Sequence, residues 1–307
     1  MSVLRPLRQV SIAATTLAVL IGAAAICSVD AAATGASGAG ARITATPDCH
    51  PGASLDRTEF PQTPRIDNRW FPLAPGTNSV LSGTVLGDDG RLHPHKIVST
   101  VSRVTKRLDG ITTLVVFERD YEDGALQESE LAFVAQDDDG TVWNVGEYPE
   151  EYEDGQLAGA PSTWISGIDH ARAGISMPAR PAMGKPAYLQ GSAPSVEFRD
   201  CGRVTQRGHR LCGPIRCYND VLVIDEWAPL EPEGGHQLKY YARGVGVIQV
   251  GATSGVNQEV LKLTSRTTLS RAALAAIDRQ VLAQDRRGYR ISTDVYRRTP
   301  RARLLCD

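Results

Sequence analysis

Alternation of apolar and polar residues dominates the middle of this 307-residue chain. Four runs rich in β-branched and aromatic residues occupy positions 96–104, 111–121, 126–136 and 141–148. Val115 and Phe117 fall on one face of the second run, and Leu131 and Phe133 do the same in the third. Because side chains alternate between the two faces of a strand, this period of two predicts β-strands and not helices.

Asp-Gly pairs separate these runs. They occur at 89–90, 109–110, 123–124, 139–140 and 154–155. Asp-Gly favours tight hairpin turns, in which both central residues need a positive φ. The tetrapeptide YEDG occurs twice, at 121–124 and 152–155. We predict that these acidic clusters are corners of an antiparallel meander and not metal or catalytic sites; the second could instead be a plain loop.

Further strands are predicted within 195–206, 217–230, 236–251 and 259–270, for a total of about ten to twelve. Ser270 is a helix cap, and an apolar stripe follows it at Leu274, Ile277 and Val281. We expect this helix to end near Arg287, with Gly288 as its stop. The predicted fold is mainly β (α+β): a large curved antiparallel sheet or open barrel with a C-terminal helix.

The N-terminus has the pattern of a secretory signal. Arg5 and Arg8 precede an apolar run at 11–27, and small residues follow it. We expect cleavage after Ala31 or Ala33, and an uncleaved membrane anchor is the alternative. Ile26 precedes Cys27 where a lipid-anchored cysteine requires a small residue. The expected organisation is a signal peptide (1–33), a flexible leader (34–64), a β domain (65–268), and a C-terminal helix with a basic tail (269–307). A secreted or cell-envelope location follows.

Five cysteines remain after such processing, and export favours disulfides. Cys212 and Cys217 flank a Gly-Pro turn and could bridge easily. Cys49 and Cys306 lie near the two ends and could join them. A zinc site that uses Cys201, His209, Cys212 and Cys217 is a weaker alternative, because the spacing matches no standard ligand pattern.

Charge is unevenly distributed, although the net charge of −2 does not favour nucleic acid as a partner. Residues 118–154 contain fourteen acidic residues and one basic residue, whereas 262–303 contain eleven basic and three acidic residues. Both segments could be solvated surfaces. Alternatively, the basic segment docks on the acidic face of its own chain or on anionic envelope polymers.

Tests for familiar chemistry mostly fail. A calcium loop ending at Gly140 would need acids where Ala135 and Gly146 stand. His93 and His95 could face one side of a strand, but no third metal ligand is evident, so a turn or the start of a strand is preferred. No metal, cofactor or catalytic residue is assigned. The carboxylates between Glu147 and Glu153 could line a cleft and supply an acid and a base.

Several motifs resemble a family of uncharacterised exported bacterial proteins, mostly actinobacterial. They are NRWFPLAPGT (68–77), VWNVGEYPEEYEDG (142–155), AGISMPARPAMGKPAY (173–188), EWAPLEP (226–232) and LKYYARGVGVIQVG (238–251). Arg243 stands where that family usually has proline. The last motif is also similar to one in exported half-barrel proteins that shelter apolar ligands. The resemblance covers about 65–265 and implies no catalytic residue.

The main hypothesis is a non-catalytic envelope protein that binds a lipid or another small apolar or amphipathic ligand. The expected ligand-binding residues are Trp143, Glu147, Trp227, Tyr240 and Tyr241. One alternative is an envelope glycan hydrolase that uses the Glu147–Glu153 cluster. Another is a structural or interaction module with an acidic face, which could bind a cell-envelope polymer. A membrane is expected only through the signal segment, if it is uncleaved.

Overall fold

The computed structural model describes residues 49–50, 54–87, 89–256 and 258–305. The expected signal peptide lies outside these residues, as does most of the expected leader. The first strands are β1 (Thr77–Leu86), β2 (Leu92–Leu108), β3 (Ile111–Glu122), β4 (Ala125–Gln136) and β5 (Val142–Glu153). The next are β6 (Gln156–Gly159), β7 (Trp164–Ile165), β8 (Arg172–Met177), β9 (Tyr188–Ala193) and β10 (Phe198–Cys212). The last are β11 (Cys217–Trp227), β12 (His236–Ala242), β13 (Gly246–Ala252), β14 (Glu259–Thr268) and β15 (Arg303–Leu304).

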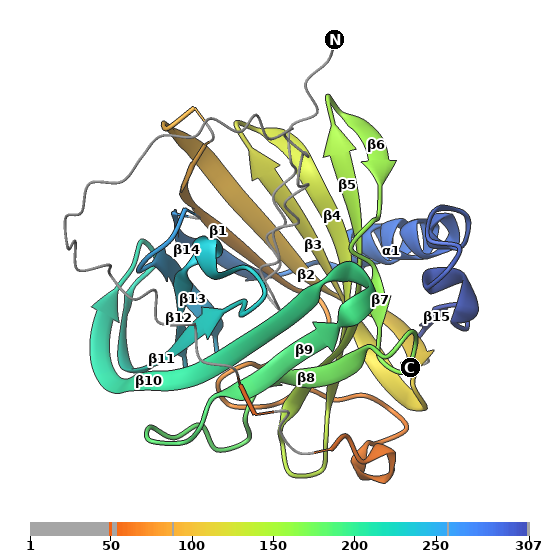
Figure 1. Cartoon of the computed structure of the whole chain (residues 1–307), viewed down its shortest axis with the longest axis horizontal. Coiled ribbons are helices and arrows are strands. Elements are labelled where there is room, and N and C mark those ends of the chain that lie inside the picture. Colours follow the sequence, from red (N-terminus) through yellow and green to blue (C-terminus); the bar gives the residue numbers. More distant parts are fainter. Residues whose placement is uncertain (1–48, 51–53, 88, 257, 306–307) are drawn as a thin grey trace, which may run out of the picture.

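Twelve of these strands close into an antiparallel barrel (Figure 1). Their order is β1-β14-β13-β12-β11-β10-β9-β8-β5-β4-β3-β2. β1 closes the ring because it pairs with both β14 and β2; Leu81 lies opposite Leu263 on one side and Ile97 on the other. β6 and β7 add to β5, and β15 adds to β2. The predicted mainly-β class is confirmed, and the curved sheet is closed.

The Asp-Gly turns position the long hairpins. Asp109-Gly110, Asp123-Gly124 and Asp154-Gly155 each have two successive positive φ angles, between 46° and 81°. This is the conformation that a two-residue hairpin turn needs. Both YEDG segments are therefore hairpin corners, including the second, which joins β5 to β6.

The walls of the barrel are buried on both faces. Leu114 and Val116 of β3 belong to the hydrophobic core inside the barrel, whereas Val115 and Phe117 of the same strand belong to a second core. The second core lies between the outer surface of β2–β5 and the C-terminal segment, whose Tyr296 packs into it. The strands in this wall therefore have apolar side chains at consecutive positions, on both faces, and not only at every second position.

Helix α1 (Arg271–Ile291) lies outside the barrel (Figure 1). The Ser270 hydroxyl accepts a hydrogen bond from the Ala273 backbone N–H at 3.2 Å, as predicted. The predicted stop at Gly288 is wrong, because the helix continues to Ile291. Gly288 has a packing role: a Cβ atom there would lie 2.6 Å from Cδ1 of Tyr296.

The short helical turns are η1 (Arg57–Glu59), η2 (Pro194–Val196), η3 (Pro232–Gly234) and η4 (Tyr296–Arg298). None of the helices in the described part of the chain has both the length and the apolar composition needed to cross a membrane.

The described residues form two disulfides. Cys212 and Cys217 are joined across the β10–β11 hairpin, which is the pair that the Gly-Pro turn suggested. Cys49 is bonded to Cys201 and not to Cys306, so that proposed pairing is wrong. Cys306 lies outside the described residues. Because Cys201, Cys212 and Cys217 are all in disulfides, the alternative zinc site is excluded as well.

Candidate functional site

The barrel interior has an apolar half and a half that we name the acidic half. Along β3, Glu118 and Asp120 continue the inward face of Leu114 and Val116. Antiparallel pairing repeats the pattern in the neighbouring strands. The nine buried carboxylic side chains that define the acidic half are Glu118, Asp120, Glu128, Glu130, Glu147, Glu151, Asp200, Glu226 and Glu259.

The acidic half contradicts the simplest interpretation of the acidic sequence segment. Glu118 lies opposite Glu130, and Asp120 lies opposite Glu128. All four side chains are buried, and Glu130 is 0% exposed. Much of the acidic segment therefore points into the barrel. This also removes most of the exposed acidic face that an interaction module would use.

Two buried bases in the described residues lie among these acids. His95 lies between Asp120, with a distance of 2.6 Å, and Glu259, at 2.9 Å. Burial alone would lower the pKa of His95, but the hydrogen bonds to these two acids raise the pKa to about 10. Lys239 Nζ lies 2.7 Å from Glu226 Oε2, and the ion pair outweighs burial and raises the lysine pKa. Nine acids and two bases leave a surplus of carboxyl groups.

Protons offset part of this surplus. Burial raises the pKa of Asp120 to about 6 and that of Glu147 to about 7, despite the opposing effect of hydrogen bonds to them. Burial, followed by nearby carboxylates, raises the pKa of Glu128 and Glu130 well above the usual value. The side chains of Glu128 and Glu130 also share a hydrogen bond, which requires a proton on one of them. Part of the acidic half is therefore protonated at neutral pH.

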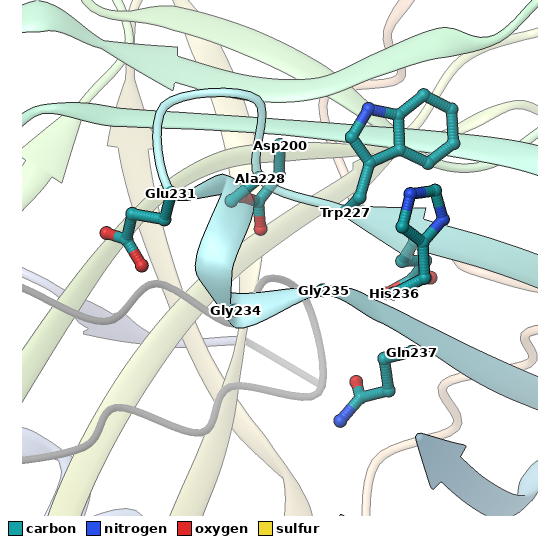
Figure 2. A pocket seen from close by; sticks show the side chains of 9 residues that line it. Asp200, Trp227, Ala228, Glu231, Gly234, Gly235, His236 and Gln237 are labelled. Atoms are coloured by element: carbon teal, nitrogen blue, oxygen red, sulfur yellow. The ribbon is translucent and has the colours of Figure 1, made fainter. Parts of the chain in front are cut away.

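A cavity of about 40 Å³, which we name the rim pocket, opens beside the acidic half where β11 ends and β12 begins (Figure 2). Its lining residues are Asp200, Glu226, Trp227, Ala228, Glu231, Gly234, Gly235, His236 and Gln237. A water-sized group needs roughly 10–15 Å³ of such space, so the pocket accommodates a small polar group and not a whole sugar ring.

Asp200 is the distinctive group of the rim pocket. The residue is 4% exposed, and its Oδ1 atom has no hydrogen-bond partner in the described structure. Burial, and then Glu147 and Glu226, raise the pKa of Asp200 well above its usual range. Glu226 is already engaged, since it accepts hydrogen bonds from Gln190 at 3.0 Å and pairs with Lys239. Asp200 therefore brings a buried carboxyl oxygen without a hydrogen-bond partner to the lining of the pocket.

The walls of the rim pocket are held firmly. The rings of Trp227 and His236 stack with centroids 5.1 Å apart, and His236 Nδ1 lies 2.8 Å from Asp225 Oδ1. Gly235 has φ +79°, and a Cβ atom there would lie 2.1 Å from the backbone oxygen of Ser254. The β11–β12 loop can thus approach the Ser254 backbone this closely only with glycine at this position.

The five expected ligand-binding residues do not converge. Trp143 packs against Phe60 in the second core, with ring centroids 6.4 Å apart, and its indole N–H donates a hydrogen bond to Asp137. Tyr241 faces inward and bonds to Glu226, whereas Tyr240 lies on the other face of β12. Trp227 lines the rim pocket and Glu147 belongs to the acidic half.

The cluster from Glu147 to Glu153 is also divided. Glu147 faces inward and accepts hydrogen bonds from Asn144 at 2.6 Å and from Trp164 at 2.9 Å. Glu150 faces the helix, where its Oε2 lies 2.6 Å from Arg287 Nη2. Because the two carboxylates lie on opposite sides of the barrel wall, they cannot act as an acid and a base on one substrate. The Glu150–Arg287 contact does show that part of the basic segment docks on its own chain.

His93 and His95 have separate roles at the start of β2. His93 contacts Asp89 at 2.9 Å and Asp123 at 2.7 Å, and these hydrogen bonds raise the pKa of His93 to about 9. One ligand atom each of His93, Glu122 and Asp123 lies within 4.8 Å of the others, so together they could hold a metal ion. Both ring nitrogens of His93 already face carboxylates, which favours an imidazolium ion pair over a metal ligand.

Sequence analysis did not identify Asp200, Glu226 or Lys239. A signal for the acidic half was nevertheless present. The pairs Glu118/Asp120 and Glu128/Glu130 flank the Asp123-Gly124 turn at similar distances, so pairing in that hairpin brings four carboxyl groups together. No comparable local pattern connects Asp200 to Glu226, although both lie on strands that were predicted.

No protein-family model matches the chain, and no curated protein matches it. One similar solved structure, from Bacteroides fragilis NCTC 9343, is described as an exported protein with a YmcC-like fold. It has 11% sequence identity to this chain and a TM-score of 0.34. The match covers 66% of this chain and 100% of that chain. Another, from Parabacteroides distasonis ATCC 8503, is described as a lipoprotein; it has 11% identity, a TM-score of 0.27 and the same coverage.

Proposed function

We propose that the protein is a non-catalytic, extracytoplasmic binding protein for an amphipathic ligand with a cationic head group. The head group occupies the rim pocket beside Asp200. The single observation that carries this proposal is the buried Asp200 carboxyl group, whose Oδ1 atom has no hydrogen-bond partner among the described residues. Two disulfides support the compartment, since such bonds persist mainly outside the reducing cytoplasm.

The charge of the site favours a cation. Asp200, Glu226 and Glu231 all line the rim pocket, and the buried base beside them, Lys239, forms its ion pair with Glu226. The acidic groups around the pocket would repel an anionic head group. A neutral head group would provide no counter-charge for them. A primary ammonium group is small enough for the cavity and donates three hydrogen bonds.

The surroundings of the pocket favour an apolar tail on the same ligand. Leu230 and Val256 are both exposed; Leu230 lies on the loop that lines the pocket, and Val256 lies on the loop between β13 and β14. The Val256 backbone N–H donates to the Glu233 carbonyl oxygen at 3.0 Å, which holds these loops together. An alkyl chain that leaves the pocket can cover both side chains, whereas the apolar half of the barrel is already filled by its own core.

Binding should release a proton. Without a ligand, burial and the nearby Glu147 and Glu226 raise the pKa of Asp200, which favours the neutral form of its carboxyl group. A cation at contact distance favours the ionised form, so cation uptake and proton loss are linked. Titration calorimetry in two buffers with different ionisation enthalpies measures this release directly. We expect a release approaching one proton for each bound ligand.

The test uses three probes with one alkyl chain and different head groups: dodecylamine, dodecanol and dodecanoate, each below its micelle-forming concentration. We expect dodecylamine to bind at least tenfold more tightly than the other two. The substitution Asp200→Asn should abolish proton release and weaken amine binding by tenfold or more. The control Glu233→Gln removes an exposed acid from the same loop without touching the pocket lining, and it should bind like the wild type.

Three results would overturn the proposal: no binding of dodecylamine, equal binding of dodecanol or dodecanoate, or amine binding without proton release. All three measurements need only the wild-type protein, so they decide the question even if Asp200→Asn does not fold.

A further inference from the structure

The exterior of helix α1 is strongly basic because the acidic residues of the helix are buried on the side that faces the barrel. The helix contains two acidic residues, and both are buried. Asp278 pairs with Arg103, with Oδ2 2.9 Å from Nη2, and Asp285 pairs with Lys106 at 2.7 Å. These contacts fasten the helix to β2. They also remove both carboxylates of the helix from its exposed face.

Three arginines form a stripe along that exposed face: Arg279, Arg286 and Arg290. At 100° and 1.5 Å per residue, they lie within about 40° of one another around the axis and span about 17 Å along it. None of the three forms an ion pair within the described part of the chain. Arg287, by contrast, turns toward the barrel and is bound by Glu150.

The basic surface continues beyond the helix. Arg297, Arg301 and Arg303 are exposed, and β15 ties this segment to β2, where Arg303 lies opposite Thr105. The Arg301 guanidinium lies 4.8 Å from the centroid of the Tyr289 ring. The stripe and the tail thus present their charges on a fixed scaffold, and a fixed scaffold reduces the entropy lost when a partner binds.

A groove of about 160 Å³ lies at the end of this surface. Arg107 and Arg298 line it together with Ser166 and Thr299. Asp169 pairs with Arg298 at 2.6 Å, whereas Arg107 is exposed and forms no ion pair among the residues described. The groove therefore adds at least one uncompensated positive charge to the basic surface.

We propose that this basic surface is a docking site for a linear phosphate-bearing polymer of the cell envelope. Arginine is suited to phosphate because its planar guanidinium can donate two parallel hydrogen bonds to one group. A row of arginines followed by a basic tail matches a partner whose charge repeats along a line. The inference is independent of the rim pocket.

A membrane surface fits these features less well. Helices that lie on membranes present apolar side chains to the lipid. Here Leu274 and Val281 of α1 are buried against the barrel, and Leu304 is the one exposed large apolar residue in the described part of the segment from 271 onward. Contact with lipid head groups would be electrostatic alone.

The experiment measures retention of the full chain on immobilised linear inorganic polyphosphate as a function of salt. The triple variant Arg279→Gln/Arg286→Gln/Arg290→Gln should bind at least tenfold more weakly. By analogy with nucleic acids, its slope of log affinity against log salt should fall by about 2 to 3. The control Arg69→Gln/Arg180→Gln/Arg210→Gln removes the same charge from exposed positions elsewhere and should bind like the wild type.

The stripe is exposed, so the thermal midpoint of both triple variants should stay close to that of the wild type. Equal loss of binding in the two triple variants would overturn the proposal, because it would show a response to net charge alone. Binding to phosphatidylglycerol vesicles without binding to polyphosphate would also overturn it, as would preference for the carboxylate polymer polygalacturonate. Dodecylamine binding serves as a separate check on the rim pocket and should be unchanged in both variants.

Discussion

Replacement of Lys239 by Met probes the electrostatic balance of the acidic half. Lys239 is 2% exposed, and its Nζ atom lies 2.7 Å from Glu226 Oε2. Asp200 and Glu259 also raise the pKa of this lysine, after Glu226. Methionine has similar length and no charge, so it leaves Glu226 buried without its cation. Removal of one partner of a buried ion pair typically costs about 3–5 kcal/mol, which is the loss of unfolding free energy that we expect near neutral pH.

The cost should depend on pH with a definite sign. Without Lys239, burial raises the folded-state pKa of Glu226 above its unfolded value, so the folded variant binds the additional proton. Stability is then retained at low pH and lost as pH rises, by about 1.4 kcal/mol per unit, until the new folded pKa is reached. The deficit relative to wild type should be clearly smaller at pH 5 than at pH 7.5.

Urea denaturation at several pH values measures the deficit, and a second variant isolates the pair. Lys239→Met/Glu226→Gln removes both charges and should recover more than half of the lost stability. A deficit that is the same at pH 5 and pH 7.5 would refute the reasoning. So would a double variant whose loss is the sum of the two single losses, because the residues would then not interact.

Three further predictions concern different parts of the molecule. Burial raises the pKa of Glu147 to about 7, so wild type should lose about 3 kcal/mol of unfolding free energy between pH 4.5 and 7, whereas Glu147→Gln should not. Urea denaturation of both proteins across that range measures the difference. Parallel curves of midpoint against pH would show that the idea is wrong. Gly288→Ala should destabilise the protein by about 1–3 kcal/mol although alanine favours helix, since its Cβ meets the Tyr296 ring, and a raised thermal midpoint would contradict this. Cys49→Ala/Cys201→Ala should lose about 5 kcal/mol and Cys212→Ala/Cys217→Ala about 2 kcal/mol, because the bonds join residues 152 and 5 positions apart; equal losses in denaturant would argue against this order.

The hairpins were predictable because their determinants are local. Asp123 and Gly124 specify a turn by their backbone preferences, and the alternation around Val115 and Phe117 specifies a strand. The helix cap at Ser270 is equally local. Closure of the barrel is not, because β1 must meet both β2 and β14, and β14 lies far away in the chain.

The site was less predictable because polar alternation does not show which face of a strand is buried. Glu118 and Glu130 have the spacing of a solvated face, yet closure of the barrel turns that face inward. Asp200 and Glu226 meet because β10 pairs with β11. Similarly, Gly288 has the local appearance of a helix stop, and only the position of Tyr296 explains why glycine stands there inside the helix.

The central claim is that the barrel encloses carboxyl groups that remain protonated at neutral pH. Infrared absorption of the folded protein in D₂O at pD 7 tests it directly, because a protonated carboxyl group has a carbonyl stretching band separate from that of a carboxylate. The account predicts this band in the wild type and a weaker band in both Glu130→Gln and Asp200→Asn. A folded wild-type protein that shows only ionised carboxylates at pD 7 would contradict it.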